Sequence, residues 1–196
     1  MNRRFGFSVA GLDYSFLGAW QAREILRQAG VEGTIVCGDL FAPPGLAGHY
    51  DVCVSYGLVE HFEDTTAVVQ ALSAFLRPGG MLITVVPNFS GWMGFLQKWM
   101  NRSVFDTHIP LSLEELAEAH KSADLELLTA EHWMTLNSGV INIETLQPIF
   151  CQRVVARTVL RFLWLASLLT WLLEERLSFE IPNRLTSPYL LCVAKK

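Results

Sequence analysis

Short apolar segments that end in a polar residue alternate with amphipathic helical segments along most of this 196-residue chain. This alternation constrains the fold more than any other feature, because strands separated by helices form a mostly parallel sheet with helices on both faces. The segments expected to be strands are residues 5–12, 33–40, 50–57, 81–88, 125–133 and 187–196. The segments expected to be helices are residues 15–30, 65–76 and 111–123.

Capping and turn residues mark where these elements begin and end. Ser15 can cap the first helix, and Gly30 follows its last turn. Ser112 and Glu115 form a capping box at the start of the last of these helices. The sequence Arg-Pro-Gly-Gly at 77–80 predicts a turn before the fourth strand, since proline stops a helix and glycine permits positive φ.

Polar residues stand at or just after the ends of the first four expected strands. In a sheet of this type, ligands bind at the carboxyl ends of the parallel strands. We therefore expect these residues to converge on one edge of the sheet and to form a binding site there. They are Asp13, Asp39, Ser55, Tyr56 and Asn88.

Composition narrows the classes of protein that this chain can be. Its length fits one domain over residues 1–196. The net charge is −4 and no cluster of Lys and Arg dominates, which argues against nucleic acid as a partner. The four cysteines form no CxxC pair, and no histidine has zinc-finger spacing, so no metal site is expected. Such cysteines are typical of a reducing, cytoplasmic compartment.

Residues 151–176 form an unusual helical segment within a long insertion. Arginines recur every four residues from Arg153 to Arg161 and predict a basic stripe. The apolar stretch that follows is shorter than the ~20 residues that a bilayer requires, but Trp164 and Trp171 suit a membrane interface. Two interpretations stay open: a helical lid packed over a pocket, or a peripheral contact with the inner face of the membrane.

Four stretches of sequence carry a resemblance to a known family. They are GLDYS at 11–15, GDLF at 38–41, DVCVSYGLVEHFED at 51–64 and LRPGGMLITVVPN at 76–88. Together they resemble a class I S-adenosylmethionine-dependent methyltransferase of the group that acts on small molecules and on quinone or lipid precursors. The resemblance implies a Rossmann-like α/β fold whose last strand is antiparallel, with S-adenosylmethionine as the cofactor.

The resemblance assigns the adenosine part of the cofactor to residues at the first two strand ends. Asp13 matches an acid that accepts hydrogen bonds from both ribose hydroxyls, and charge-assisted bonds of this kind are strong. Tyr14 would lie beside the adenine. Asp39 matches the acid that meets the adenine amino group, and Leu40 would pack nearby. The alternatives are a helix cap for Asp13 and an ordinary loop acid for Asp39.

The resemblance places the methionine part of the cofactor near the third strand end, at Ser55 and Tyr56. His61 belongs to a Glu-His pair that is common in the family, and histidine is the natural general base near neutral pH. The alternative is that the pair orders its helix and loop. Some quinone methyltransferases bind a divalent metal in this region, but they carry a further acid where this chain has Gly57, which argues against a metal here.

Two further residues are candidates for contact with the substrate. Asn88 ends the fourth strand and is expected to orient an acceptor. His108 lies in the first of two insertions, residues 89–110 and 138–186, which are expected to build the substrate pocket or lid. The aromatic content of these insertions indicates a small, apolar acceptor of aromatic or lipid-like character. A satisfied loop histidine is the alternative for His108.

The glycine-rich strand and turn that hold the methionine end in this family have no match in the chain, and residues 3–6 resemble the end of the helix that follows them. We therefore expect a fragment whose first strand–helix unit is missing, with the strands 5–12 and 50–57 flanking the gap. A non-catalytic remnant that acts as a membrane-associated or partner-binding module is the alternative function. A nicotinamide-dependent reductase is disfavoured because no tyrosine is followed four residues later by lysine.

Overall fold

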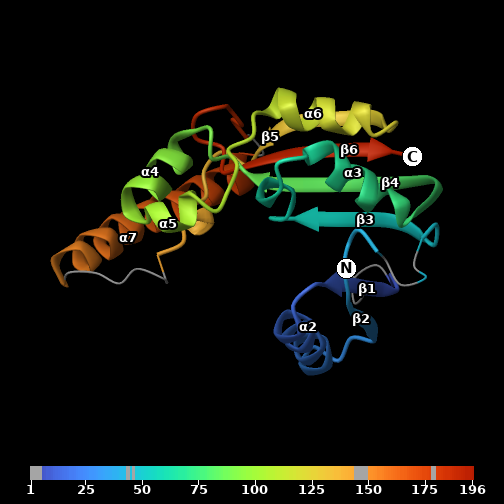
Figure 1. The fold of residues 1–196 in the computed structure, drawn as a ribbon. Coiled ribbons are helices and arrows are strands. Elements are labelled where there is room, and N and C mark those ends of the chain that lie inside the picture. Colours follow the sequence, from blue (N-terminus) through green and yellow to red (C-terminus); the bar gives the residue numbers. More distant parts are fainter. Residues whose placement is uncertain (1–5, 43–44, 46, 144–149, 178–179) are drawn as a thin grey trace. The chain divides into compact units, whose positions relative to one another are not determined.

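The computed structural model describes residues 6–42, 45, 47–143, 150–177 and 180–196 (Figure 1). The predicted helix end at 3–6 therefore lies almost wholly outside the described residues, and so does the Arg153 side chain. The chain divides into two compact units, Met1–His49 and Tyr50–Lys196, each with its own sheet. Whether the two units act as one domain, as the sequence predicts, stays a prediction.

The first unit is a strand–helix–strand motif. Strand β1 (Val9–Asp13) pairs in parallel with β2 (Gly33–Cys37), and α2 (Phe16–Gln28) connects them. The Ser15 hydroxyl caps α2 by accepting a hydrogen bond from the Gly18 amide at 3.2 Å. Gly30 takes φ +59° just after the helix, so both predicted boundary residues are confirmed.

The second unit has a four-stranded sheet in the order β3-β4-β6-β5 (Figure 1). Strands β3 and β4 are parallel, whereas β6 runs antiparallel to both of its neighbours, as expected for the last strand. In the described residues β1 pairs with β2 alone and β3 with β4 alone. The strands are β3 (Tyr50–Tyr56), β4 (Leu76–Pro87), β5 (Glu126–Trp133) and β6 (Tyr189–Lys195).

Helices α3 (Thr65–Ala74) and α6 (Leu113–Ser122) pack on one face of this sheet. The capping box of α6 is present: the Ser112 hydroxyl accepts from the Glu115 amide at 3.1 Å, and the Glu115 carboxylate accepts from the Ser112 amide at 2.8 Å. On β3, Ser55 points to the face covered by the helices, and the side chains of the opposite face are exposed: Val52, Val54 and Tyr56. Within the described residues, this part of the opposite face is therefore not covered by a helix.

The prediction that residues 77–80 form a turn is wrong, because these residues belong to β4. The register between β3 and β4 shifts between Tyr50 and Val52, which marks an irregularity in the ladder. Gly79 takes φ +80° there, and its amide donates to the Lys196 carbonyl at 2.9 Å. Pairing with neighbouring strands thus keeps this Pro-Gly-Gly segment inside the sheet.

The insertion at 89–110 contains helices rather than an open loop: α4 (Trp92–Met100) and α5 (Arg102–Phe105). The short 3-10 helices are η1 (Val59–His61) and η2 (Ser138–Val140), and α7 spans Phe150–Leu177. The inner face of α4 forms an apolar cluster with residues after β5 and with one face of α7. This cluster contains Met93, Leu96, Met100, Ile141, Val159, Leu160 and Leu163.

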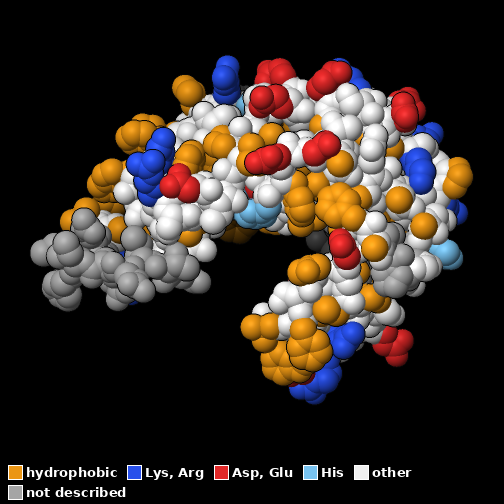
Figure 2. All heavy atoms as spheres, viewed as in Figure 1, with side chains coloured by type: hydrophobic (Ala, Val, Ile, Leu, Met, Phe, Trp, Pro, Cys, Tyr) orange, Lys and Arg blue, Asp and Glu red, His pale blue; other side chains and the backbone are white. Residues whose placement is uncertain are grey.

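Outside this cluster, much of the surface of α7 is exposed and apolar. Trp164 is 60% exposed and Trp171 is 53% exposed, and several leucines lie beside them. By length and composition alone, residues Val154–Leu177 could cross a membrane. From the sequence, the apolar stretch is expected to be too short for that. Hydrophobic side chains also gather on the surface over α4 at the left of the space-filling view (Figure 2).

Candidate functional site

In the first unit, the two acidic candidates stand at neighbouring strand ends. Asp13 is the last residue of β1, and Asp39 follows β2 by two residues. The Gly38 amide donates to the Asp13 carbonyl at 3.0 Å, so the parallel pairing brings both acids to the same sheet edge. Tyr14, next to Asp13, is 83% exposed, and Leu40 is half-buried. Within this unit, Asp13 and Asp39 therefore lie at one edge of the sheet, as expected from the sequence.

Both acids also make local hydrogen bonds. Asp13 Oδ1 accepts from the Ser15 amide at 2.8 Å, and Asp39 Oδ1 accepts from the Phe41 amide at 2.9 Å. Each carboxylate thus closes a local turn at the end of its strand. A carboxylate has two oxygens with about four lone-pair sites, so one local bond leaves capacity for a ligand hydroxyl or amine.

Gly18 on α2 is a positioning residue that the sequence did not reveal. A Cβ atom at this position would clash with Asp13 Oδ2, far inside van der Waals contact. The Asp13 carboxylate therefore lies directly over the first turn of α2, where helix amides and the helix dipole favour negative charge. A glycine four or five residues after a strand-end acid is the signal that points to this arrangement.

In the second unit, Ser55 and Tyr56 end β3. Ser55 is 3% exposed, and its buried hydroxyl has no hydrogen-bond partner in the structure. Tyr56 is exposed, and its ring lies 5.4 Å from the ring of Tyr189 on β6. Burial and a hydrogen bond with Tyr56 raise the pKa of Tyr189. The predicted roles of Ser55 and Tyr56 in holding the cofactor stay predictions.

Asn88 follows β4 at the same edge of the second sheet, but its side chain faces the protein. It is fully buried, and its Nδ2 donates to the carbonyls of Arg184 and Ser187, both at 2.9 Å. Its Oδ1 accepts from the Ser90 hydroxyl at 2.9 Å. These bonds tie two distant segments together and favour a structural role, while its contact with an acceptor stays a prediction.

The fold brings His108 next to Glu60 and His61, which are adjacent in the sequence and 47 or more residues before it. One ligand atom from each side chain lies within 4.8 Å of the others, and the two imidazole rings are 4.5 Å apart between centroids. His61 Nδ1 lies 3.0 Å from the carbonyl of Thr107, and His108 Nδ1 lies 2.7 Å from the carbonyl of Val104. The two predicted catalytic histidines are thus neighbours.

Burial sets the electrostatics of this cluster. Glu60 is 2% exposed, and its Oε2 has no hydrogen-bond partner among the described residues. Burial raises the pKa of the Glu60 carboxyl, and a hydrogen bond from its own backbone and the nearby His61 only partly offset this. Burial also lowers the pKa of His108, against the opposing effect of its bond to the Val104 carbonyl. The cluster therefore holds electron-pair donors in a poorly solvated place.

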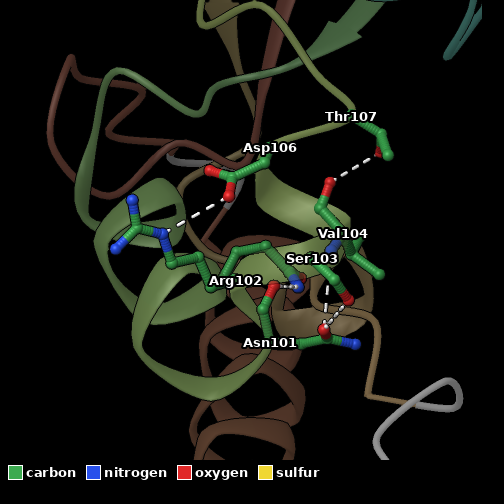
Figure 3. Close-up of polar contacts among 7 residues, drawn as sticks. Asn101, Arg102, Ser103, Val104, Asp106 and Thr107 are labelled. Atoms are coloured by element: carbon green, nitrogen blue, oxygen red, sulfur yellow. Dashed lines mark hydrogen bonds and ion pairs between the residues drawn. The ribbon is translucent and has the colours of Figure 1, made fainter.

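The α5 turn, which precedes His108 in the chain, is held by polar contacts of its own side chains (Figure 3). Asn101 caps the turn, with its Oδ1 accepting from the Val104 amide at 3.4 Å. Arg102 Nε donates to the Asp106 carboxylate at 3.3 Å, and the Thr107 hydroxyl donates to the Val104 carbonyl at 2.7 Å. His108, which follows Thr107, therefore directly follows a turn held by side-chain bonds. The sequence predicts a loop around His108 and does not predict this turn.

His120 is the most deeply buried histidine among the described residues, and it serves the core. It lies between α6 and β4, where Nε2 is 2.9 Å from the Thr84 hydroxyl and Nδ1 is 2.7 Å from the Leu116 carbonyl. Burial lowers the pKa of His120 despite the bond to the Leu116 carbonyl. These contacts place it in the packing of the sheet rather than in the site.

Comparison with known proteins gives a family match over part of the chain. Residues 1–84 match the model of a methyltransferase domain. No curated protein sequence matches the chain.

Several solved structures share the fold at low sequence identity. A protein from Galdieria sulphuraria described as a sarcosine dimethylglycine methyltransferase is 19% identical, with a TM-score of 0.63 over 100% of this chain and 72% of that one. A geranyl diphosphate methyltransferase solved with S-adenosylmethionine is 17% identical, with a TM-score of 0.60 over 99% and 71%. The [4+2]-cyclase SpnF is 15% identical, with a TM-score of 0.59 over 99% and 67%. These likenesses establish the fold.

Proposed function

We propose that this chain, whose residues 1–84 carry a methyltransferase domain on the fold of class I S-adenosylmethionine-dependent methyltransferases, transfers a methyl group to a small, apolar acceptor. The observation that carries the proposal is the pair of acids at neighbouring strand ends, inside the matched residues. S-adenosylmethionine supplies a methyl group that its sulfonium already activates. What the protein must add is orientation of the acceptor and exclusion of water.

We assign the adenosine part of the cofactor to the first unit. Asp13 would accept hydrogen bonds from the ribose hydroxyls, and Asp39 would accept one from the adenine amino group. The exposed ring of Tyr14 would stack on the base, with Leu40 packing beside it. In the second unit, the unpartnered hydroxyl of Ser55 and the neighbouring Tyr56 would meet the methionine part.

The acceptor is inferred from the apolar surfaces of the second unit. Trp92, Phe95 and Trp99 are exposed on α4, in the insertion that follows β4. Aromatic side chains of this kind favour an aromatic or prenyl-like ligand over a strongly charged one. His108 belongs to this insertion and His61 lies next to it, and both would contact the polar end of such an acceptor, where the reacting nucleophile is.

A labelled-methyl assay tests the proposal. The purified chain is incubated with methyl-tritiated S-adenosylmethionine and a panel of phenols, amines and prenyl diphosphates, including geranyl diphosphate. We expect label in at least one apolar acceptor, and much less label with the Asp13→Asn variant. No label in any acceptor above the level of a heat-denatured control would count against methyl transfer and favour the non-catalytic alternative.

We further propose that the exposed face of α7 binds a membrane surface at the inner face of the cytoplasmic membrane, where a lipid-like acceptor would be collected. Trp164 and Trp171 are half or more exposed and are suited to the interface, and Arg157 and Arg161 are exposed on the same helix. A helical lid over the pocket is the competing role. It is supported by the packing of the other face of α7 against α4.

Co-sedimentation with anionic vesicles separates these two roles. We expect the wild-type chain to pellet with the vesicles and a Trp164→Asp/Trp171→Asp variant to stay in the supernatant. Trp20→Asp is the matched control, because Trp20 is 54% exposed on α2 and is not part of the α7 face. A wild-type chain that stays in the supernatant would favour the lid. Vesicle binding without methyl transfer would favour the membrane-associated remnant.

A further inference from the structure

The side chains of Glu60, His61 and His108 bring electron-pair donors to one place. A backbone carbonyl only accepts hydrogen bonds, so the bond to Thr107 places a proton on His61 Nδ1, and the bond to Val104 places one on His108 Nδ1. In the neutral rings, Nε2 then carries the lone pair. The Glu60 carboxylate adds a further electron-pair donor at the same place.

The buried carboxylate is the second, independent observation. Glu60 is 2% exposed, and its Oε2 has no hydrogen-bond partner in the structure. An unpaired carboxylate oxygen away from water is costly, and native proteins rarely keep one without an ion, a water or a functional reason. A cation at the cluster would pair with this oxygen and with both imidazole nitrogens.

We propose that Glu60, His61 and His108 bind a single divalent cation of the borderline class, such as Zn²⁺ or Co²⁺. Two imidazoles and one carboxylate suit these ions, whereas Mg²⁺ and Ca²⁺ prefer oxygen ligands alone. Three protein ligands leave positions open for water or for an oxygen of a small molecule, and His61 is exposed on that side. The sequence argued against a metal here because Gly57 stands where some quinone methyltransferases have a further acid, whereas in the structure the third side chain beside the Glu-His pair is His108, which follows the distant α5 turn.

The distances are compatible with such a site. Ligand atoms about 2.1 Å from one ion in tetrahedral geometry lie about 3.4 Å apart. The three ligand atoms already lie within 4.8 Å of one another, so the widest pair would approach by at most about 1.4 Å.

Neighbouring groups hold the rings in an orientation suited to metal binding. His108 Nδ1 is 2.7 Å from the Val104 carbonyl and 3.1 Å from the Thr107 hydroxyl. The ring of buried Phe89 packs edge-on against the His108 ring at 4.9 Å. Carbonyl and hydroxyl partners on the far nitrogen of a ligating histidine are the usual outer contacts of metal sites, where they fix the tautomer.

Titration with Co²⁺ tests this proposal independently of methyl transfer. The chain is stripped with EDTA, titrated with CoCl₂ near pH 7.5 and followed by visible d–d absorption, and Zn²⁺ is then added as a competitor. We expect one Co²⁺ per chain, displaced by Zn²⁺ and not by excess Mg²⁺. The conservative Glu60→Gln variant and the His61→Ala and His108→Ala variants should each lose roughly 100-fold or more in affinity.

The matched control is His49→Ala. His49 is exposed, and its Nδ1 also lies close to a backbone carbonyl, that of Ala47 at 2.6 Å, but it is not part of the cluster. Its loss should leave the Co²⁺ affinity unchanged, and circular dichroism verifies that every variant is folded. The proposal is overturned if the wild-type chain shows no d–d band, or if the band survives both His61→Ala and His108→Ala. A thiolate charge-transfer band would also overturn it, since it would place the ion at exposed Cys37.

Discussion

At the scale of single residues, the polar side chains at strand ends combine a local bond with a proposed ligand contact. Asp13 accepts from the Ser15 amide, and Asp39 accepts from the Phe41 amide. The sequence predicts where these acids stand, because strand ends follow from the apolar pattern. It cannot choose between cap and ligand, since the same carboxylate geometry serves both.

Replacing Asp13 with Asn separates these two roles. The Asn side-chain oxygen can still accept from the Ser15 amide, so stability should change little. The charge that strengthens bonds to ribose hydroxyls is lost, and affinity for S-adenosylhomocysteine should fall by about tenfold to a hundredfold. Isothermal titration calorimetry measures this change. Asp64→Asn is the matched control, because the Asp64 carboxylate also accepts a hydrogen bond from a nearby backbone amide, that of Ala67, at 2.9 Å. Equal affinity of Asp13→Asn and wild type would assign Asp13 to capping alone.

Thr107→Val tests the groups that orient His108. The Thr107 hydroxyl lies 3.1 Å from His108 Nδ1, and valine keeps the shape without the oxygen. The backbone carbonyl of Val104 still holds the ring, so we expect a partial effect: Co²⁺ affinity about tenfold weaker with unchanged stoichiometry. The same visible titration measures it. An unchanged affinity would show that the carbonyl alone fixes the tautomer.

At the scale of elements, pairing with neighbouring strands determines the secondary structure of segments whose local sequence is ambiguous. Proline and glycine at 77–80 predict a turn, yet these residues lie in β4 because the amide of Gly79 and the carbonyl of Gly80 pair with Lys196 at the C-terminal end of the chain. Local propensity contains no information about that partner. By contrast, the starts of α2 and α6 were predictable, because Ser15, Ser112 and Glu115 cap their own helices.

Gly79→Ala measures the conformational cost within β4. Gly79 has φ +80° and open space around the position of a Cβ atom, so a methyl group adds backbone strain without a clash. We expect a loss of about 1–2 kcal/mol in the free energy of unfolding, and a smaller loss for Gly79→Asn. Urea denaturation provides the measurement. A Gly79→Ala variant as stable as wild type would mean that this segment relaxes to negative φ.

His120, between α6 and β4, should make the stability of the fold depend on pH. Histidine in an unfolded chain titrates near pH 6.5, and burial lowers the pKa of His120 in the folded state. The unfolded state therefore binds more protons in this range, so stability is complete above about pH 6.5 and falls as the pH drops toward the folded pKa.

The His120→Gln variant should show a flatter dependence over the same range. Urea unfolding at a series of values between about pH 7.5 and 5 measures both proteins. If the slopes of wild type and variant are equal, protonation of His120 is not what destabilises the fold in acid.

At the scale of the whole molecule, the sequence predicts the α/β class, the antiparallel last strand and most element positions. Each of these follows from periodicity and caps or from the family resemblance. It does not predict α4 and α5, because the apolar face of α4 is explained only by its packing against α7. The sequence also did not predict that Glu60, His61 and His108 form a cluster. His108 joins the other two only through the tertiary contact between the residues after α5 and η1.

The central claim is that this chain uses S-adenosylmethionine. Isothermal titration calorimetry of the folded wild-type chain with S-adenosylmethionine, and separately with NAD⁺, tests it most directly. The account predicts saturable binding of one S-adenosylmethionine per chain, competition by S-adenosylhomocysteine and no binding of NAD⁺. Binding of NAD⁺ but not of S-adenosylmethionine, or of neither by a folded chain, would contradict the account.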